Sequence, residues 1–129
     1  MQKKYKDQAA FYIVYIREAH PTDGRQSGAN TREGILVEQP TTFDARSDVA
    51  LKMCVMLNLA LPCLIDGIDN KVGNAYAGMP DRLYVVGIDG TIVFKGDRGP
   101  RGFKPAEAEA ALDKHLAELK AKSTSVKDE

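Results

Sequence analysis

The sequence predicts one α/β domain with three layers, and three observations carry this prediction. Strand-like segments alternate with helix-like segments, an Asp89-Gly90 hairpin signal follows, and a helical pattern closes the chain after Pro105. Alternating strands and helices that end in an antiparallel hairpin and a helix are typical of this architecture. A chain of 129 residues, 43% of them apolar, suits one domain with one core.

The first third of the chain predicts a helix end, a strand and a loop. Residues 1–9 resemble the last turns of a helix. Residues 11–16 are aromatic or β-branched throughout, which predicts a strand buried on both faces, as in parallel sheets. Residues 22–42 are mostly polar and contain glycines, so they predict a long loop, and loops of that length are usually functional or mobile.

The middle of the chain predicts a helix, a short strand and a connection. The helix covers about residues 45–59, with Ser47 or Thr42 as its N-cap. Its apolar residues occupy nearly every face, so we expect it to be well buried. Residues 63–66 predict a strand, and residues 67–79 predict a connection with one helical turn.

The last third predicts a hairpin and a helix. Residues 83–87 and 91–95 are β-rich and flank Asp-Gly, which favours a tight hairpin turn. Pro105 suits the first turn of a helix. The inward stripe of that helix consists of Ala108, Ala111, Leu112, Leu116 and Leu119. We therefore expect one domain over residues 1–121 and a frayed polar tail over residues 122–129.

Composition excludes several classes of function. Eighteen basic and eighteen acidic residues cancel, so nothing supports a nucleic acid or an anionic membrane as partner. The longest apolar run, residues 9–16, is too short to span a bilayer. Cys54 and Cys63 are too few for a disulfide scaffold, and no Cys/His cluster has the spacing of a zinc site. We expect no bound metal and a reducing, cytoplasmic location.

Glu18 and His20 are the first candidates for chemistry. They follow the first predicted strand, and ligands of open α/β sheets bind beyond the carboxyl ends of such strands. Their spacing of two points both side chains to one side of an extended backbone. A carboxylate beside an imidazole can orient it and raise its pKa, which suits a general acid near neutral pH. The alternative is an exposed loop histidine next to a solvated glutamate.

Other residues allow two interpretations each. Cys63 is either a small buried hydrophobe or a thiol near the active end of the sheet, whereas Cys54 suits core packing. Pro80 is either a turn proline or a cis-proline at a substrate-binding edge. Arg98 lies in a glycine-rich loop before a helix N-terminus, an arrangement that can hold an anion. That loop does not match the nucleotide-binding motifs.

These residues resemble a known family. Residues 11–24, Phe-Tyr-Ile-Val-Tyr-Ile-Arg-Glu-Ala-His-Pro-Thr-Asp-Gly, closely resemble the strand and loop of the iodothyronine deiodinases and their bacterial redoxin-like relatives. Further matches follow in the same order at Pro62-Cys63, Asn74-Ala75-Tyr76, Arg82 to Val86, Gly90-Thr91-Ile92, Arg98-Gly99-Pro100 and Gly102-Phe103. The resemblance spans about residues 11–103.

The resemblance implies a thioredoxin-like fold, a three-layer α/β/α sandwich with a mixed sheet. It also implies a thiol-dependent oxidoreductase, in which a selenocysteine or cysteine before the first helix attacks the substrate. Glu18 and His20 would belong to the proton-handling network, and Cys63 would help to regenerate the nucleophile. Apart from the resemblance, Pro80 and Arg98 are the candidates for binding substrate. The implied partners are a small-molecule or thiol substrate and a thiol reductant, with no cofactor.

The sequence departs from the family at three points. Arg17 stands where the vertebrate enzymes usually have a second glutamate. Pro80 stands where those enzymes lack proline but where thioredoxins and peroxiredoxins have their cis-proline. The chain begins inside the first helix, so we expect the first strand and the nucleophile to be missing. Loss of that strand would expose strand edges, which favours a homodimer.

Two hypotheses follow. The first is an oxidoreductase domain truncated at its N-terminus, and the second is a non-catalytic thioredoxin-like module that holds a partner at the same sheet end. The coding sequence upstream of Met1 discriminates between them. We expect no significant thiol-dependent activity from these 129 residues, no disulfide between Cys54 and Cys63, and a common side of the sheet for Glu18, His20 and Pro80.

Overall fold

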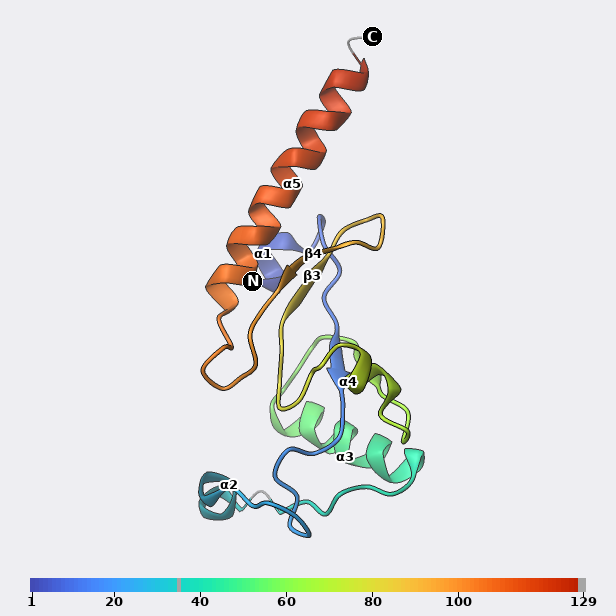
Figure 1. Cartoon of the computed structure of the whole chain (residues 1–129), viewed down its shortest axis with the longest axis vertical. Helices are drawn as coiled ribbons and strands as arrows, with labels where there is room; N and C mark the ends of the chain where they lie inside the picture. Colours follow the sequence, from blue (N-terminus) through green and yellow to red (C-terminus); the bar gives the residue numbers. More distant parts are fainter. Residues whose placement is uncertain (35, 128–129) are drawn as a thin grey trace. The chain divides into compact units, whose positions relative to one another are not determined.

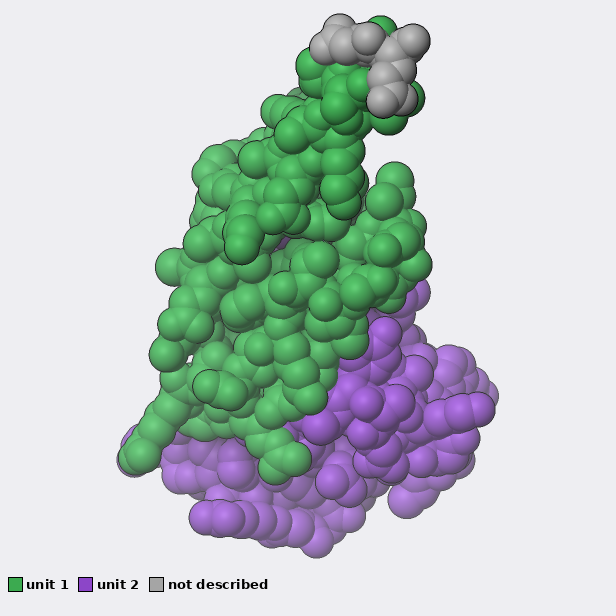
Figure 2. Space-filling view, turned by 45° about the horizontal axis from the view of Figure 1, so that its top comes forward, with its two compact units in different colours: residues 1–10, 81–129 green, residues 11–80 purple. Residues whose placement is uncertain are grey.

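The computed structural model describes residues 1–34 and 36–127 (Figure 1). The chain divides into two compact units, one of residues 11–80 and one that combines residues 1–10 with residues 81–129 (Figure 2). Helices and strands occur in both units, which is compatible with the α/β class. The described strands form one parallel and one antiparallel pair, where the sequence predicted a single mixed sheet.

The parallel pair lies in the unit of residues 11–80. Strand β1 (Ile13–Tyr15) runs beside strand β2 (Cys63–Ile65), and Val14 is the register partner of Leu64. Register partners share a face, and here both side chains are exposed, by 43% and 52%. The prediction that the first strand is buried on both faces is therefore wrong, because no described element covers the face of these two residues.

Helix α3 (Phe43–Met56) packs against β2. The Thr42 side chain accepts a hydrogen bond from the Ala45 N–H, so Thr42 rather than Ser47 is the N-cap. Only two residues of the helix are buried, Arg46 and Ala50. The expectation of a well-buried helix is wrong, since neighbours cover one face only and three apolar side chains lie largely in solvent: Leu51, Val55 and Met56.

Two short helices complete this unit. Helix α2 (Gly28–Glu33) interrupts the segment that was predicted to be loop throughout, and it ends at Gly34, whose φ of +71° suits glycine. A polar six-residue helix carries no apolar period by which a sequence could reveal it. Helix α4 (Lys71–Ala75) confirms the helical turn expected in the connection after β2.

The other unit contains the predicted hairpin. Strands β3 (Tyr84–Val86) and β4 (Ile92–Lys95) pair antiparallel, with one irregularity in register beside Val86. Gly90 has a φ of +83°, which explains why the turn contains Asp-Gly. The hairpin prediction is confirmed.

Helix α5 (Pro105–Lys127) begins at the expected proline and packs against β3 and β4. Ala108 and Leu112, two members of the predicted inward stripe, are buried. The helix continues through Lys127, where the sequence predicted a frayed tail. Helix α1 (Gln2–Tyr5) contacts α5 through the Tyr5 hydroxyl, which donates to Asp113 Oδ1 at 2.6 Å.

Candidate functional site

The candidate site lies at the carboxyl ends of β1 and β2. Since the two strands are parallel, the segment that follows β1 and the segment that follows β2 begin at the same edge of the pair. The first segment carries Arg17, Glu18 and His20, and the second carries Asp66 and Asn70. The fold thus brings together two segments that are far apart in the chain.

A buried arginine and a buried aspartate fix the second segment. Arg46 is 1% exposed, and its guanidinium donates to the carbonyl oxygens of Asp66 and Gly67 and to Asn70 Oδ1 at 3.3, 2.7 and 2.8 Å. Asp66 is 2% exposed, and its two carboxylate oxygens accept N–H groups in the first turn of α4, from Val72 and Gly73. Together these bonds hold α3, the end of β2 and α4 in one arrangement.

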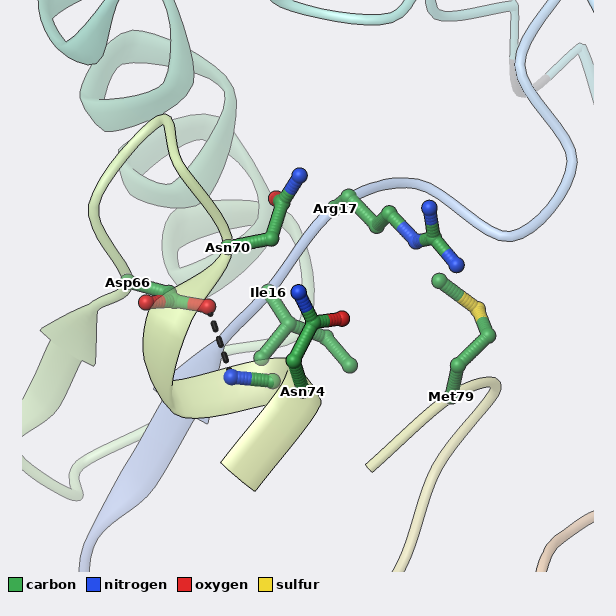
Figure 3. Close-up of a pocket in the computed structure, with 7 residues that line it drawn as sticks. Ile16, Arg17, Asp66, Asn70, Asn74 and Met79 are labelled. Carbon is green, nitrogen blue, oxygen red and sulfur yellow. Dashed lines mark hydrogen bonds between the residues drawn. The ribbon is translucent and has the colours of Figure 1, made fainter. Parts of the chain in front are cut away.

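A small hollow opens at this edge (Figure 3). Its volume of about 10 Å³ is at the lower limit for one ordered water molecule. Its polar lining comes from two asparagines, an arginine and an aspartate, and the full lining is Ile16, Arg17, Asp66, Asn70, Gly73, Asn74 and Met79.

A cis-proline follows the last residue of this lining. Met79 precedes Pro80, and the peptide bond between them is cis. The structure thus has the cis-proline that one interpretation of Pro80 required, next to a residue that lines the hollow. The role of Pro80 in binding substrate stays a prediction.

Glu18 is held through its backbone. The Glu18 N–H donates to Gln39 Oε1, and Gln39 Nε2 donates to the Glu18 carbonyl, both at 3.0 Å. The Gln39 N–H donates in turn to Asp23 Oδ1 at 2.9 Å. Burial raises the pKa of the half-buried Glu18 carboxyl, and the nearby Arg46 charge partly opposes that shift. Glu18 therefore keeps its proton to a higher pH than an exposed glutamate.

His20 is exposed, and its ring bonds to the backbone. Its Nδ1 lies 3.0 Å from the Arg25 carbonyl oxygen. Because a carbonyl only accepts, Nδ1 carries a proton and donates it in this bond. One interpretation of the sequence was that Glu18 can orient this ring, and the hydrogen bond found for the ring goes to the Arg25 carbonyl. The catalytic roles of Glu18 and His20, and the side of the sheet they share with Pro80, stay predictions.

Arg98 belongs to the other unit, in a loop that folds tightly on its own backbone. The Gly102 N–H donates to the Arg98 carbonyl at 2.9 Å, and a Cβ at Gly102 would lie 2.5 Å from that same oxygen. This close approach explains the glycine. The Arg98 side chain is exposed, and its role in binding substrate stays a prediction.

Cys54 and Cys63 are free thiols, as predicted. Both are half-buried, and Cys54 lies close enough to Cys63 to affect the pKa of its thiol. The expectation that Cys54 is packed in the core is wrong, because its side chain is only partly buried. Burial, and then contact with Cys54, raise the pKa of Cys63 to about 11. At neutral pH this thiol is protonated and unreactive.

We predict that Cys63 reacts slowly with iodoacetamide. At pH 8 its thiolate fraction is about 100-fold smaller than at the ordinary pKa of 9.0, and the alkylation rate should rise until the pH reaches about 11. Cys54→Ala should shift this profile only part of the way back, because burial is the larger cause. Mass spectrometry of each cysteine-containing peptide measures both rates, with the urea-unfolded chain as the reference. A folded-state profile that levels off near pH 9 would contradict the prediction.

Sequence reasoning missed three residues of this framework: Arg46, Gln39 and Asn70. Arg46 carried a signal, since it is a charge in a helix whose apolar residues predicted burial. Gln39 and Asn70 carried none, because each acts on a partner distant in the chain.

Among residues 1–34 and 36–127, no three His, Cys, Asp or Glu side chains are grouped as a metal site requires. Within those ranges no helix has the length and apolarity to cross a membrane.

Comparison with known proteins gives consistent matches. A sequence model of the iodothyronine deiodinase family matches residues 1–116. The chain is similar to the thyroxine 5-deiodinase of Homo sapiens, with 32% identity over 118 residues, which are 90% of this chain and 36% of the relative. It is also similar to the thyroxine 5-deiodinase of Aquarana catesbeiana, with 36% identity over 111 residues, which are 84% of this chain and 39% of the relative. The chain therefore spans well under half the length of the curated relatives it matches.

Proposed function

Since the chain belongs to the iodothyronine deiodinase family, we propose that it forms most of a thioredoxin-like, thiol-dependent oxidoreductase domain. The observation that carries the proposal is the family match over residues 1–116, which includes the segment with Glu18 and His20. The position of this segment after the carboxyl end of β1 supports it, because α/β domains bind their ligands there.

The proposed chemistry needs a thiolate or selenolate from outside these 129 residues. That nucleophile attacks an electrophilic halogen, oxygen or sulfur atom of the substrate, and the bond from that atom to the rest of the substrate breaks. His20, as imidazolium, gives its Nε2 proton to the leaving fragment, while the Arg25 carbonyl holds the ring through Nδ1. A thiol reductant then attacks the oxidised sulfur or selenium atom, and the halide, water or substrate thiol leaves as a mixed disulfide or selenenyl sulfide forms. A second thiol completes the reduction, so that one disulfide leaves for each substrate reduced.

The relatives' names point to thyroxine, an iodinated aromatic, as their substrate. For this chain a small halogenated aromatic, a peroxide and a disulfide are all candidates, because each offers an atom that a thiolate can attack. A cytoplasmic location fits two free thiols. A homodimer would cover the exposed face of Val14 and Leu64. The cytoplasmic location and the homodimer are both parts of this proposal.

The test compares the 129-residue chain with a chain extended by the residues encoded upstream of Met1. We expect background turnover from the shorter chain in a dithiothreitol-coupled assay, with hydrogen peroxide, a low-mass disulfide and an iodinated phenol as substrates. The extended chain should turn over at least one of these, and replacing its upstream cysteine or selenocysteine with alanine should abolish the activity.

Two outcomes would contradict the proposal. Turnover by the 129-residue chain that Cys63→Ser abolishes and Cys54→Ser does not would make Cys63 the nucleophile. An extended chain that supplies a strand, a nucleophile and a helix but remains inactive on all three substrates would favour the non-catalytic module.

A further inference from the structure

The hollow beside β1 and β2 has an unequal supply of hydrogen-bond donors and acceptors. Each oxygen of its one carboxylate, Asp66, already accepts one backbone N–H group, at 2.8 and 3.0 Å. The Arg46 guanidinium also lies close to Asp66, since it binds the carbonyl of that residue. The side chains of Arg17, Asn70 and Asn74 add hydrogen-bond donors to this lining.

Asn70 presents one of these donors in a fixed orientation. Arginine has only donors, so the Asn70 atom that meets Arg46 must be the oxygen Oδ1. This bond fixes which atom of the Asn70 amide is the oxygen and which is the nitrogen. It leaves both Nδ2 protons for another partner. In the described part of the chain no acceptor meets Asn70 Nδ2, and the Asn74 side chain makes no hydrogen bond there.

Arg17 supplies the charge. Among the described residues, no carboxylate lies within 4.0 Å of its guanidinium, and the ion pairs found involve Lys4 and Lys104 instead. Figure 3 shows Arg17, Asn70 and Asn74 around one hollow, with Met79 beside them. An arginine with two amide donors suits a planar carboxylate.

We propose that this hollow binds the carboxylate of a small-molecule ligand, with Arg17 providing the charge and the Asn70 and Asn74 amides the hydrogen bonds. The proposal rests on the proposed function in one respect, since it places the carboxylate on the substrate of that same site. The volume of about 10 Å³ admits one oxygen atom, so the body of the ligand lies on the open side. Two residues of the lining, Arg17 and Asn74, are exposed.

The test is a binding measurement that needs no turnover. Benzoate is titrated into the isotope-labelled 129-residue chain, with the neutral isostere benzamide and inorganic phosphate as separate arms. We expect benzoate to shift the Asn70 and Asn74 side-chain amide signals in nuclear magnetic resonance spectra, with a millimolar Kd, and benzamide to leave them in place. Arg17→Met should weaken benzoate binding about tenfold, and Asn74→Ala should weaken it less. The matched control is Lys52→Met, a loss of one exposed charge on α3, which should bind as the unaltered chain does.

Several results would overturn the assignment. These are equal shifts with benzamide, an unchanged Kd in a folded Arg17→Met chain, or phosphate binding tighter than benzoate. Circular dichroism checks the fold of each variant. Because binding is read without chemistry, a failed reductase assay would leave this result standing, and absent benzoate binding would leave the oxidoreductase proposal standing.

Discussion

Replacing Arg46 with methionine is expected to lower the free energy of unfolding by about 2–4 kcal/mol. Methionine fills much of the same space but donates no hydrogen bond. Two backbone carbonyls at the end of β2 and the Asn70 amide oxygen would then be left without their donor in an almost closed environment. Such unsatisfied groups each cost on the order of 1–3 kcal/mol, less what water recovers. Urea titration followed by circular dichroism measures the change.

The matched control for this prediction is Lys52→Met. Lys52 lies on the same helix and is exposed, so its replacement should change stability by no more than about 0.5 kcal/mol. Arg46→Lys should fall between the two, because one ammonium group cannot reach both carbonyls and the amide. A loss below about 1 kcal/mol for Arg46→Met would show that the guanidinium does not hold the segment after β2 in solution.

Replacing His20 is expected to have the second large effect, a loss of catalytic activity. In the extended, active chain, His20→Gln should reduce kcat/KM about 100- to 10,000-fold, the usual contribution of a general acid. Glutamine still donates to the Arg25 carbonyl, so the loop keeps its hydrogen bond while the proton donor is lost.

The pH profile separates this role from a structural one. Loss of a general acid changes how kcat/KM depends on pH, whereas a purely structural change leaves that dependence as it is. His115→Gln, a change at the chain's other histidine, should stay within about twofold of the unaltered kcat/KM, because His115 lies outside the proposed proton-handling network. A His20→Gln enzyme that retains both its rate and its pH dependence would remove His20 from the chemistry.

Local signals in the sequence predicted the local structure well. Asp89-Gly90 indicates a tight turn by itself, because glycine tolerates the positive φ found there, and Pro105 marks the first residue of α5. The same kind of reasoning overstated burial. The apolar character of Val14 and Val55 shows that these side chains are suited to a core, but the number of covered faces depends on elements distant in the chain.

For the candidate site too, the sequence predicted some of the residues and missed others. The motif of residues 11–24 predicted Glu18 and His20 just after a strand, and β1 ends at Tyr15. The partners that fix this segment could not be predicted, because Gln39 lies 21 residues from Glu18 and bonds to its backbone rather than to a recognisable side chain. Arg46 likewise acts on carbonyl oxygens, which every residue has and no sequence pattern marks.

The division of the chain into two units bears on the order in which it folds. The contact between Tyr5 and Asp113 closes a loop of 108 residues, and residues 11–80 form a unit of their own inside that loop. The entropy lost on closure grows with the logarithm of the flexible length, by about 0.6 kcal/mol for each doubling. When residues 11–80 become compact first, less flexible chain remains between α1 and α5 as they meet. Folding from the inner unit outwards is therefore the entropically favoured order for this chain.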